Sequence, residues 1–147
     1  MAIRLSLDLQ EVQFDRVHAW LAGSYWSPGI RREVVENAFR HSLVASAFDE
    51  SGTQVGVARV ITDRATFAYL CDVFVDETCR GMGIGKLLVQ HLLRHPELQT
   101  LRHWALATRD AHSLYAGFGF GPVPEGRWMR KPMPNAGWQV VGYIPPA

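Results

Sequence analysis

The chain has 147 residues, of which 48% are hydrophobic and 11% aromatic, and its formal net charge at pH 7 is +1. This length is typical of one ordinary domain, and the apolar content is sufficient for a buried core, which excludes global disorder. The near-zero net charge argues against an electrostatic surface for nucleic acid or for membranes.

The first residues and the cysteines indicate a cytoplasmic protein. The first twenty residues carry several charges and no long apolar run, so we expect no secretory signal, and no stretch approaches the ~20 apolar residues of a membrane span. Cys71 and Cys79 are too few for a disulfide framework, so we expect two reduced thiols. Reactive-thiol chemistry would need a neighbouring base, which the sequence does not specify.

The N-terminal third predicts a strand, a helix, an aromatic loop and a second helix. Their expected bounds are 3–7, 14–23, 25–29 and 30–42. Asp8 and Glu11 have the spacing of a capping box, with Asp in place of Ser or Thr, ahead of the first helix. The apolar stripes of the two helices are expected at Phe14, Val17 and Leu21, and then at Ile30, Val34 and Ala38.

The middle of the chain predicts three consecutive antiparallel strands. Leu43–Phe48 and Gln54–Ile61 flank the turn residues 49–52, as in a hairpin. Ala68–Asp76 follows as a central strand rich in β-branched and aromatic residues.

The rest of the chain predicts two helices and three strands. The first helix begins at Ile84 and ends before Pro96, because proline lacks the N–H that a helix needs. Leu101–Ala107 is then a strand parallel to the central one, since a helix crosses over between them. Asp110 should cap a short helix that runs through Tyr115. The last two strands are expected over 118–120 and 127–131.

Together these elements predict a single α/β (α+β) domain over residues 1–131 and a proline-containing tail over residues 132–147. The sheet should be mixed and mostly antiparallel, with about six or seven strands flanked by helices. The basic residues at the end of the domain are interpreted as a solvated strand edge.

Three glycines at alternate positions, Gly81 to Gly85, separate the central strand from the following helix. A glycine turn that opens a helix exposes free backbone N–H groups at the positive end of the helix dipole, which suits a phosphate or pyrophosphate; a plain tight turn is the alternative. Two phosphate-loop templates do not fit. The dinucleotide fingerprint needs a third glycine where Lys86 or Leu88 stands, and the P-loop needs a glycine in place of Arg80.

The turn does match R-x-x-G-x-G through Arg80, Gly83 and Gly85, and a second motif, A-x-x-L-Y-x-x-x-G-F, matches from Ala111 to Phe120. On these two motifs the sequence resembles the GCN5-related N-acetyltransferase (GNAT) superfamily, which binds acetyl-coenzyme A. Segments 26–30 and 65–69 are similar to those of a bacterial subgroup of small acetyltransferases. The resemblance extends to about residue 131, and it implies a sheet that splays between the central strand and the next parallel strand.

The resemblance also implies a coenzyme site. The N–H groups of residues 81–86 would bind the pyrophosphate, with Arg80 shaping the loop, and the backbone of residues 73–75 would pair with the pantetheine arm. Thr108 stands where the family often has Asn, which shortens the reach of that side chain. The residues implied in coenzyme binding are Val73, Phe74, Val75, Arg80, Gly81, Met82, Gly83, Ile84, Gly85, Lys86, Thr108, Ser113 and Tyr115.

Three positions are candidates for catalysis. By resemblance, Tyr115 occupies the place of the family's usual general acid, and an N–H near Phe74 would polarise the thioester carbonyl. Asp72 is a carboxylate within an apolar strand, where burial without a partner is costly. It takes the proton from the amine, or holds a cationic substrate, or forms an ion pair with an arginine such as Arg59; the sequence leaves these alternatives open.

The acceptor side and metal binding are less specific. Tyr25, Trp26 and Ser27 lie in the loop where the family builds its acceptor pocket, and aromatic residues there bind substrate or fill the core. His91 and His95 have the i, i+4 spacing of zinc ligands, but no third ligand is evident, so no metal is expected.

The sequence therefore predicts an acetyl-coenzyme A-dependent N-acetyltransferase that acetylates a primary amine of a small molecule by direct attack in a ternary complex. A homodimer is compatible with the tail and the edge strands, and no nucleic acid or membrane is expected as a partner. The alternatives are acetylation of a protein or peptide amine, and a non-catalytic acyl-coenzyme A-binding regulatory module.

Overall fold

The computed structural model describes residues 2–134 and 136–145. At its centre is a five-stranded sheet in the order β1-β2-β3-β4-β5. The first four strands run antiparallel to their neighbours, and β5 lies parallel to β4. The strands are β1 (Arg4–Ser6), β2 (Leu43–Phe48), β3 (Gln54–Thr62), β4 (Phe67–Val75) and β5 (His103–Leu106).

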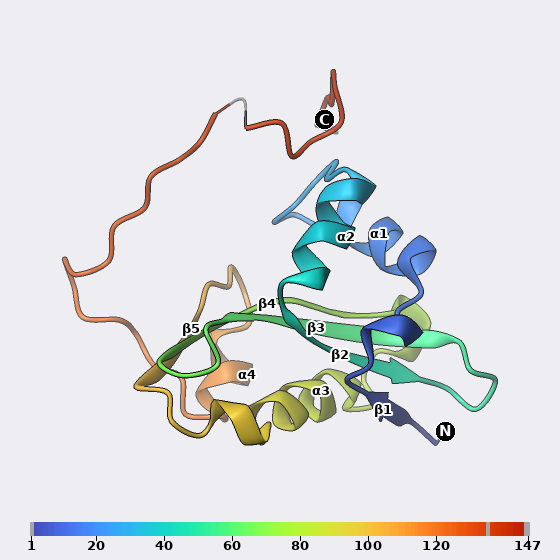
Figure 1. Cartoon of the computed structure of the whole chain (residues 1–147), viewed down its shortest axis with the longest axis horizontal. Coiled ribbons are helices and arrows are strands. Elements are labelled where there is room, and N and C mark those ends of the chain that lie inside the picture. The colour runs from blue at the N-terminus through green and yellow to red at the C-terminus, as the bar shows by residue number, and fades with distance from the viewer. Residues whose placement is uncertain (1, 135, 146–147) are drawn as a thin grey trace.

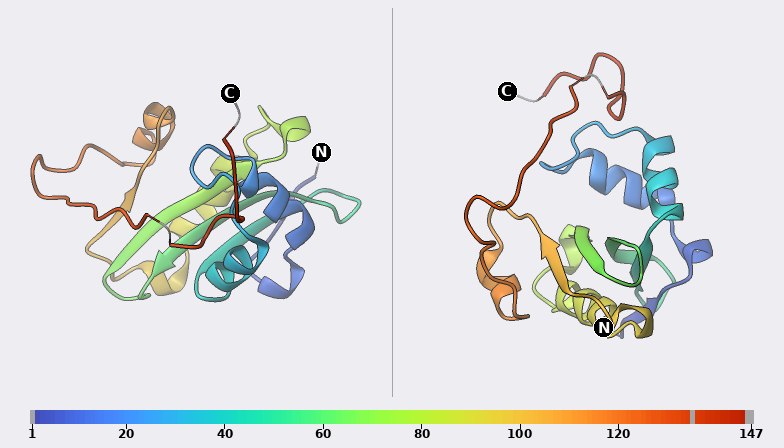
Figure 2. Two further views of the ribbon diagram at one scale, coloured as in Figure 1. Left: turned by 90° about the horizontal axis from the view of Figure 1, so that it is seen from above. Right: turned by 60° about the vertical axis from the view of Figure 1, so that its left-hand side comes forward.

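Helices cover both faces of this sheet (Figure 1). Helices α1 and α2 lie on one face and α3 and α4 on the other, as the rotated views of Figure 2 also show. The α-helices are α1 (Phe14–Ala22), α2 (Arg32–Arg40), α3 (Ile84–Leu93) and α4 (His112–Ala116). Three short 3-10 turns, η1 (Leu9–Glu11), η2 (Glu77–Cys79) and η3 (Pro96–Leu98), join them to the strands.

One half of the core lies between α3 and the sheet. Ile84, Leu88 and Leu92 follow one another at intervals of one helical turn and are buried. The helix approaches β3 closely at Gly56, where an added β-carbon would stand 3.0 Å from Leu88 Cδ1. This contact fixes the height of α3 over the sheet, and with it the position of the glycine turn at its N-terminus.

The other half of the core lies under α1 and α2, and here one expected stripe is wrong. Val35 and Phe39 are the buried residues of α2. The helix begins at Arg32, two residues later than expected, and the large Phe39 side chain takes the inward position. The expected stripe is only half-buried: Ile30, Val34 and Ala38.

The first helix is confirmed, whereas its expected cap is not. Val17 and Leu21 are buried on the inward face of α1, as expected. Asp8 instead caps the 3-10 turn η1, where its carboxylate accepts a backbone hydrogen bond. Glu11 does not complete a capping box, because its carboxylate accepts from Arg4 at 2.9 Å.

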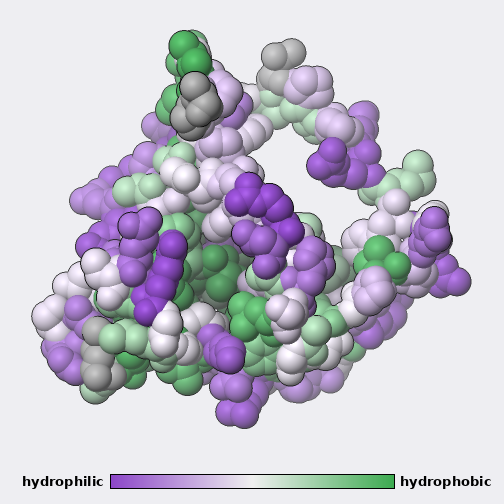
Figure 3. Space-filling view, turned by 180° about the vertical axis from the view of Figure 1, so that it is seen from behind, coloured by the Kyte–Doolittle hydropathy of each residue, from purple (hydrophilic) through white to green (hydrophobic). Residues whose placement is uncertain are grey.

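The end of the chain differs most from expectation. No strand forms over 118–120 or 127–131, so among the described residues the sheet has five strands rather than six or seven. Residues 119–126 include three glycines, which favour turns, and two prolines, which lack the N–H that a sheet ladder needs. The chain after α4 instead arches away from β5, as the opening in Figure 3 shows, and returns to the opposite face.

The returning tail pairs with the segment between α1 and α2. The Arg31 N–H donates to the Trp138 carbonyl at 2.8 Å, and the Val140 N–H donates to the Gly29 carbonyl at 2.8 Å. An isolated bridge between Ile30 and Gln139 lies between these two bonds. The tail is therefore attached to the loop that precedes α2. Among the described residues, no helix combines the length and apolar character needed to cross a bilayer.

We expect Leu88→Ala to lower the free energy of unfolding by about 2–5 kcal/mol, because it leaves a cavity where α3 meets β3. Leu87→Ala is the matched control on the same helix, since Leu87 is 41% exposed, and it should change the unfolding free energy by less than about 0.5 kcal/mol. Urea denaturation followed by circular dichroism measures both. Equal losses in the two variants would contradict the packing described above.

Candidate active site

The parallel pairing of β4 and β5 stops halfway along β4. It joins Phe67–Leu70 to His103–Leu106, and β5 then ends, whereas β4 continues to Val75. Residues 71–75 of β4 therefore have no strand beside them on this side. The space between these residues and the segment that follows β5 is called the gap below. The splayed sheet expected from the family resemblance is confirmed.

A β-bulge lies where the two strands part. The register of β3 against β4 shifts by one residue between the pairs Arg59↔Cys71 and Val57↔Phe74. Asp72 adopts a left-handed backbone conformation, with φ of 51°. Such a conformation costs about 1–2 kcal/mol for a non-glycine residue, although Asp tolerates it better than most. The bulge bends β4 and re-aims its side chains, as bulges beside functional sites do.

The bulge also decides which backbone amides face the gap. The Asp76 N–H donates to the Val55 carbonyl at 2.8 Å. Because hydrogen-bonded pairs alternate along an antiparallel ladder, Phe74 faces β3, whereas Val73 and Val75 face the open side. The expected donor near Phe74 is therefore narrowed to the N–H of Val73 or Val75, its two neighbours on β4.

The Asp72 side chain is fully paired. One carboxylate oxygen accepts from Arg59 Nε at 2.7 Å, and the other accepts from Trp26 Nε1 at 2.8 Å. The Arg59 and Asp72 side chains are only 14% and 10% exposed. Arg59 also donates to Ser42 Oγ at 3.1 Å. The ion pair that the sequence left as one alternative is therefore present, and it includes an indole that the sequence did not indicate.

A loop between α1 and α2 covers the gap; residues 24–28 are called the roof loop below. Trp26 reaches down from it to Asp72, and Tyr25 contacts the far side of the gap. The Arg109 N–H donates to Tyr25 Oη at 3.1 Å, and the Arg109 guanidinium lies 3.9 Å from the centre of the Tyr25 ring. The roof loop is thus attached to both walls. No sequence pattern marked Arg109, because its partner lies 84 positions away.

A cavity of about 180 Å³ lies under the roof loop, between β4 and the segment that follows β5. Six of the expected site residues lie together in its walls: Tyr25, Trp26, Asp72, Val73, Thr108 and Tyr115. The remaining lining residues are Tyr69, Leu70, Cys71, Leu106, Ala107, Asp110 and Ala111. The walls therefore combine aromatic and aliphatic side chains with two carboxylates, those of Asp72 and Asp110.

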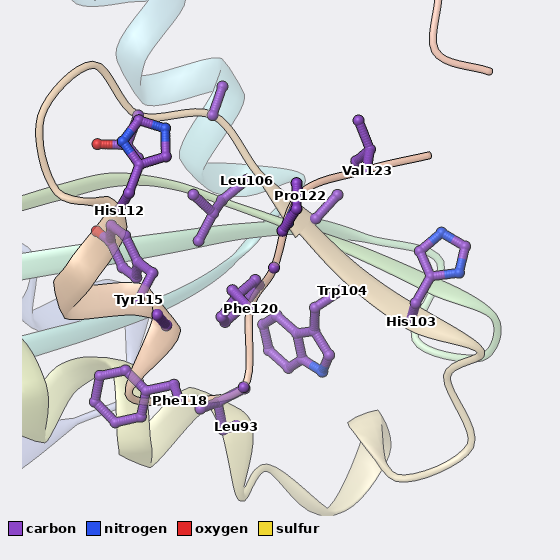
Figure 4. A pocket seen from close by; sticks show the side chains of 16 residues that line it. Leu93, His103, Trp104, Leu106, His112, Tyr115, Phe118, Phe120, Pro122 and Val123 are labelled. Carbon is purple, nitrogen blue, oxygen red and sulfur yellow. The ribbon is translucent and has the colours of Figure 1, made fainter. Parts of the chain in front are cut away.

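A larger cavity of about 680 Å³ lies on the other side of β5 (Figure 4). Trp104, Leu106, Phe118 and Phe120 line it, and Tyr115 of α4 borders both cavities. Strands expected after α4 would have covered this side of β5. In their absence the edge of β5 faces an apolar hollow.

Burial keeps two groups of the gap in their neutral forms. It raises the pKa of the Tyr115 phenol above its ordinary value of 10.0, with a smaller contribution from Tyr25. It raises the pKa of the Cys71 thiol to about 12. At neutral pH Tyr115 therefore retains the proton that a general acid needs, and Cys71 is not a thiolate nucleophile.

The glycine turn has the geometry of an anion site. Gly81 and Gly83 have φ of 82° and 80°, which favours glycine, and Gly83 is the N-cap of α3. No side chain caps this helix end, so the first N–H groups of α3 have no acceptor within the helix. Arg80 braces the turn, because its Nε donates to the Val75 carbonyl at 3.0 Å.

Three expected residues lie elsewhere or act differently. Ser27 turns away from the cavity and bonds with Ser24 at the end of α1. Ser113 is exposed on α4. Thr108 accepts from the Ala111 N–H at 3.1 Å and so caps the turn before α4, a role that we had expected of Asp110.

Among the described residues, no group of three or more His, Cys, Asp or Glu side chains lies where it could hold a metal ion. His95 caps the 3-10 turn η3, where its Nδ1 accepts from the Glu97 N–H at 3.1 Å.

A mixed sheet that opens beside a glycine-rich helix N-terminus is the arrangement that the resemblance to the GNAT acetyltransferases implies. The family model of the acetyltransferase (GNAT) family matches residues 7–120, and the chain belongs to this family. A crystal structure from Xanthomonas campestris pv. campestris, assigned to the same family, is 40% identical and has a TM-score of 0.87. The match covers 92% of this chain and 96% of that one.

Two curated relatives are plant proteins. The chloroplastic GCN5-related N-acetyltransferase 2 of Arabidopsis thaliana is 30% identical over 58% of this chain and 38% of its own length. A histone acetyltransferase of Glycine max is 33% identical over 58% of this chain and 39% of its own length. The chain thus spans less than half of the length of either plant protein.

We expect Cys71 to resist alkylation in the folded protein. With a thiol pKa of about 12, its thiolate fraction at pH 8 should be lower than that of an ordinary thiol, and its reaction with iodoacetamide slower, by about a thousandfold. Mass spectrometry of the Cys71 peptide over time measures this rate, with the urea-unfolded chain as control. A rate close to that of free glutathione would contradict the burial described here.

Proposed function

We propose that this protein transfers an acetyl group from acetyl-coenzyme A to a primary amine of a small molecule, by direct attack in a ternary complex. The observation that carries the proposal is the cavity of about 180 Å³ at the point where β4 and β5 part. It is bordered by the bulged strand on one side and by Tyr115 on the other. Its small size favours a small acceptor.

The chain's own groups fit the coenzyme. The uncapped N-terminus of α3 offers N–H groups and a favourable dipole to a pyrophosphate, and Lys86 adds an exposed positive charge there. The amides of Val73 and Val75 are available to an extended pantetheine arm, which would add to the open side of β4 like a strand. The thioester supplies an activated acyl group, and the protein has to hold and polarise it.

Two groups of the chain would assist the chemistry. The Val73 N–H would donate to the oxyanion that forms when an amine attacks the thioester carbon. Tyr115, kept protonated by burial, would donate a proton to the departing thiolate, and the proton that the amine loses would replace it by way of solvent. Because Cys71 is held as a neutral thiol, an acyl-enzyme on that residue is disfavoured, which supports direct transfer.

Two alternatives remain under test. One plant relative is named a histone acetyltransferase, which favours a protein or peptide amine as the second candidate acceptor. A regulatory module that binds acyl-coenzyme A without turnover is the third candidate function.

We propose a location in the bacterial cytoplasm, because the protein has two free thiols and is similar to the Xanthomonas structure. We also propose that a homodimer, if it forms, uses the open edge of β5.

Thiol release from acetyl-coenzyme A separates these functions. The probes are spermidine, glucosamine, free lysine and a lysine-containing histone-tail peptide. The small-molecule proposal expects release that depends on one of the first three probes. Release with the peptide alone would favour the protein acetyltransferase. Coenzyme binding without acceptor-dependent release throughout would favour the regulatory module.

Gly83→Ala should weaken coenzyme binding at least about tenfold, since a β-carbon opposes the left-handed conformation by about 1–2 kcal/mol and the N-terminus of α3 would rearrange. Gly52→Ala is the matched control, because Gly52 also has positive φ and open space around it but lies in the β2–β3 turn. Isothermal titration with coenzyme A measures both. Equal affinities in the two variants would remove the glycine turn from the site.

Tyr115→Phe should lower kcat by about 10²–10⁴-fold, the usual contribution of a general acid, while the coenzyme dissociation constant changes little. Because burial raises the phenol pKa, the alkaline fall of the wild-type rate should lie at a higher pH than an ordinary tyrosine would give. Stopped-flow thiol release against pH measures both properties. An unchanged kcat in the variant would show that Tyr115 only packs against its neighbours.

A further inference from the structure

The gap contains a carboxylate at the β-bulge, that of Asp72, and each of its two oxygens already accepts a hydrogen bond. Asp72 accepts from Arg59 Nε at 2.7 Å and from Trp26 Nε1 at 2.8 Å. Arg59 is itself held by Ser42 Oγ and lies 5.9 Å from the centre of the Phe39 ring. Asp72 is thus the middle member of a chain of contacts that runs from the α2 side of the core to the roof loop.

The backbone at Asp72 directs the side chain into this chain of contacts. The left-handed conformation and the extra residue of the bulge turn Asp72 out of the regular β4 alternation. A strained residue of this kind persists only when its surroundings hold it, and strain of this kind gathers at sites with a function. Here the surroundings are one guanidinium from β3 and one indole from the roof loop.

The roof loop has one anchor on each wall of the cavity. Trp26 is fixed to β4 through Asp72, and Tyr25 is fixed to the segment after β5 through Arg109. The two rings pack edge to face with their centres 5.0 Å apart, so the anchors act on a single aromatic unit. The position of this unit sets the height of the cavity in which the acceptor must lie.

We propose that Asp72 is a positioning residue: it fixes Trp26, and through Trp26 the roof loop, over the acceptor, and it does not take the proton from the amine. Both oxygens already accept from donors, one of them cationic, so a proton taken from the amine would have to compete with these two bonds. The acceptor is then recognised by the aromatic side chains of the walls and by the height of the roof, with Asp110 as the other carboxylate of the lining. This inference rests on the proposed acetyl transfer only for its kinetic test.

The kinetic test compares Asp72→Asn with Trp26→Phe, which removes the indole N–H together with part of the aromatic ring and leaves both partners of the Arg59–Asp72 pair in place. A hydrogen bond to a charged group is worth about 1.5–3 kcal/mol, so each variant should raise the acceptor KM by about 10- to 100-fold. The kcat should change by less than about threefold, and the acidic limb of kcat/KM against pH should remain. The double variant should show less than the product of the two effects, since both break one contact.

A different outcome would overturn the proposal. If Asp72 were the general base, Asp72→Asn would lower kcat by about 10²–10⁴-fold and remove the acidic limb, while Trp26→Phe would retain both. Trp128→Phe controls for the loss of an indole elsewhere, because Trp128 is 49% exposed and its ring lies beside Phe67, at the far end of β4 from Asp72. Thermal denaturation of every variant shows whether it is folded. If Asp72→Asn does not fold, Trp26→Phe tests the proposal by itself, because the proposal expects its KM to rise while its kcat stays nearly unchanged.

A second measurement needs no acceptor and so separates this inference from the proposed function. The Trp26 indole N–H, assigned by its absence in Trp26→Phe, should exchange slowly with solvent in a ¹⁵N spectrum of the folded protein. Asp72→Asn should accelerate this exchange at least about tenfold, because the hydrogen bond that protects it is weakened. Asp110→Asn changes another carboxylate of the cavity, which is 68% exposed, and should leave the exchange unchanged. If the exchange rate of the Trp26 indole N–H is the same in Asp72→Asn as in the wild type, the positioning role is wrong, even if the enzyme is active.

Discussion

The separation of β5 from β4 beyond Leu70 is the constraint on which the site depends. It leaves the half-buried residues 71–75 of β4 without a strand on their outer side. An edge of this kind can pair with an extended occupant that hydrogen-bonds to it. The bulge at Asp72 lies at the same place and bends β4 there. The open side of β4 and the cavity under the roof loop thus result from one irregularity of the sheet.

The sequence predicted the parts that depend on local chemistry. The glycine turn was recognisable because positive φ at Gly81 and Gly83 requires glycine, and β2 and β3 because their apolar residues are contiguous and bounded by turn formers. Parts that depend on long-range contacts were not predictable. The inward face of α2 lies one residue later than expected, because the large side chain of Phe39 packs into the core between α2 and the sheet. The contact of Tyr25 with Arg109 has no local signature, since the two residues are far apart in the sequence.

The final strands illustrate a different limit. Residues 127–131 were expected to form a strand, yet the glycines and prolines before them carry the chain away from β5. A strand needs a neighbour as well as a suitable composition, and the neighbour is determined by the route of the chain. The same reasoning applies to Asp72: its presence in an apolar strand was evident, but its partners became evident only once the bulge and the roof loop were placed.

The pairing of the tail with residues 29–31 links the end of the chain to the segment that continues the roof loop. The roof is thus held from outside as well as from within, by backbone bonds that are indifferent to side-chain identity. A change in the length or stiffness of the C-terminal segment would therefore reach the roof loop through the backbone alone, without any change in the glycine turn or in the bulge of β4.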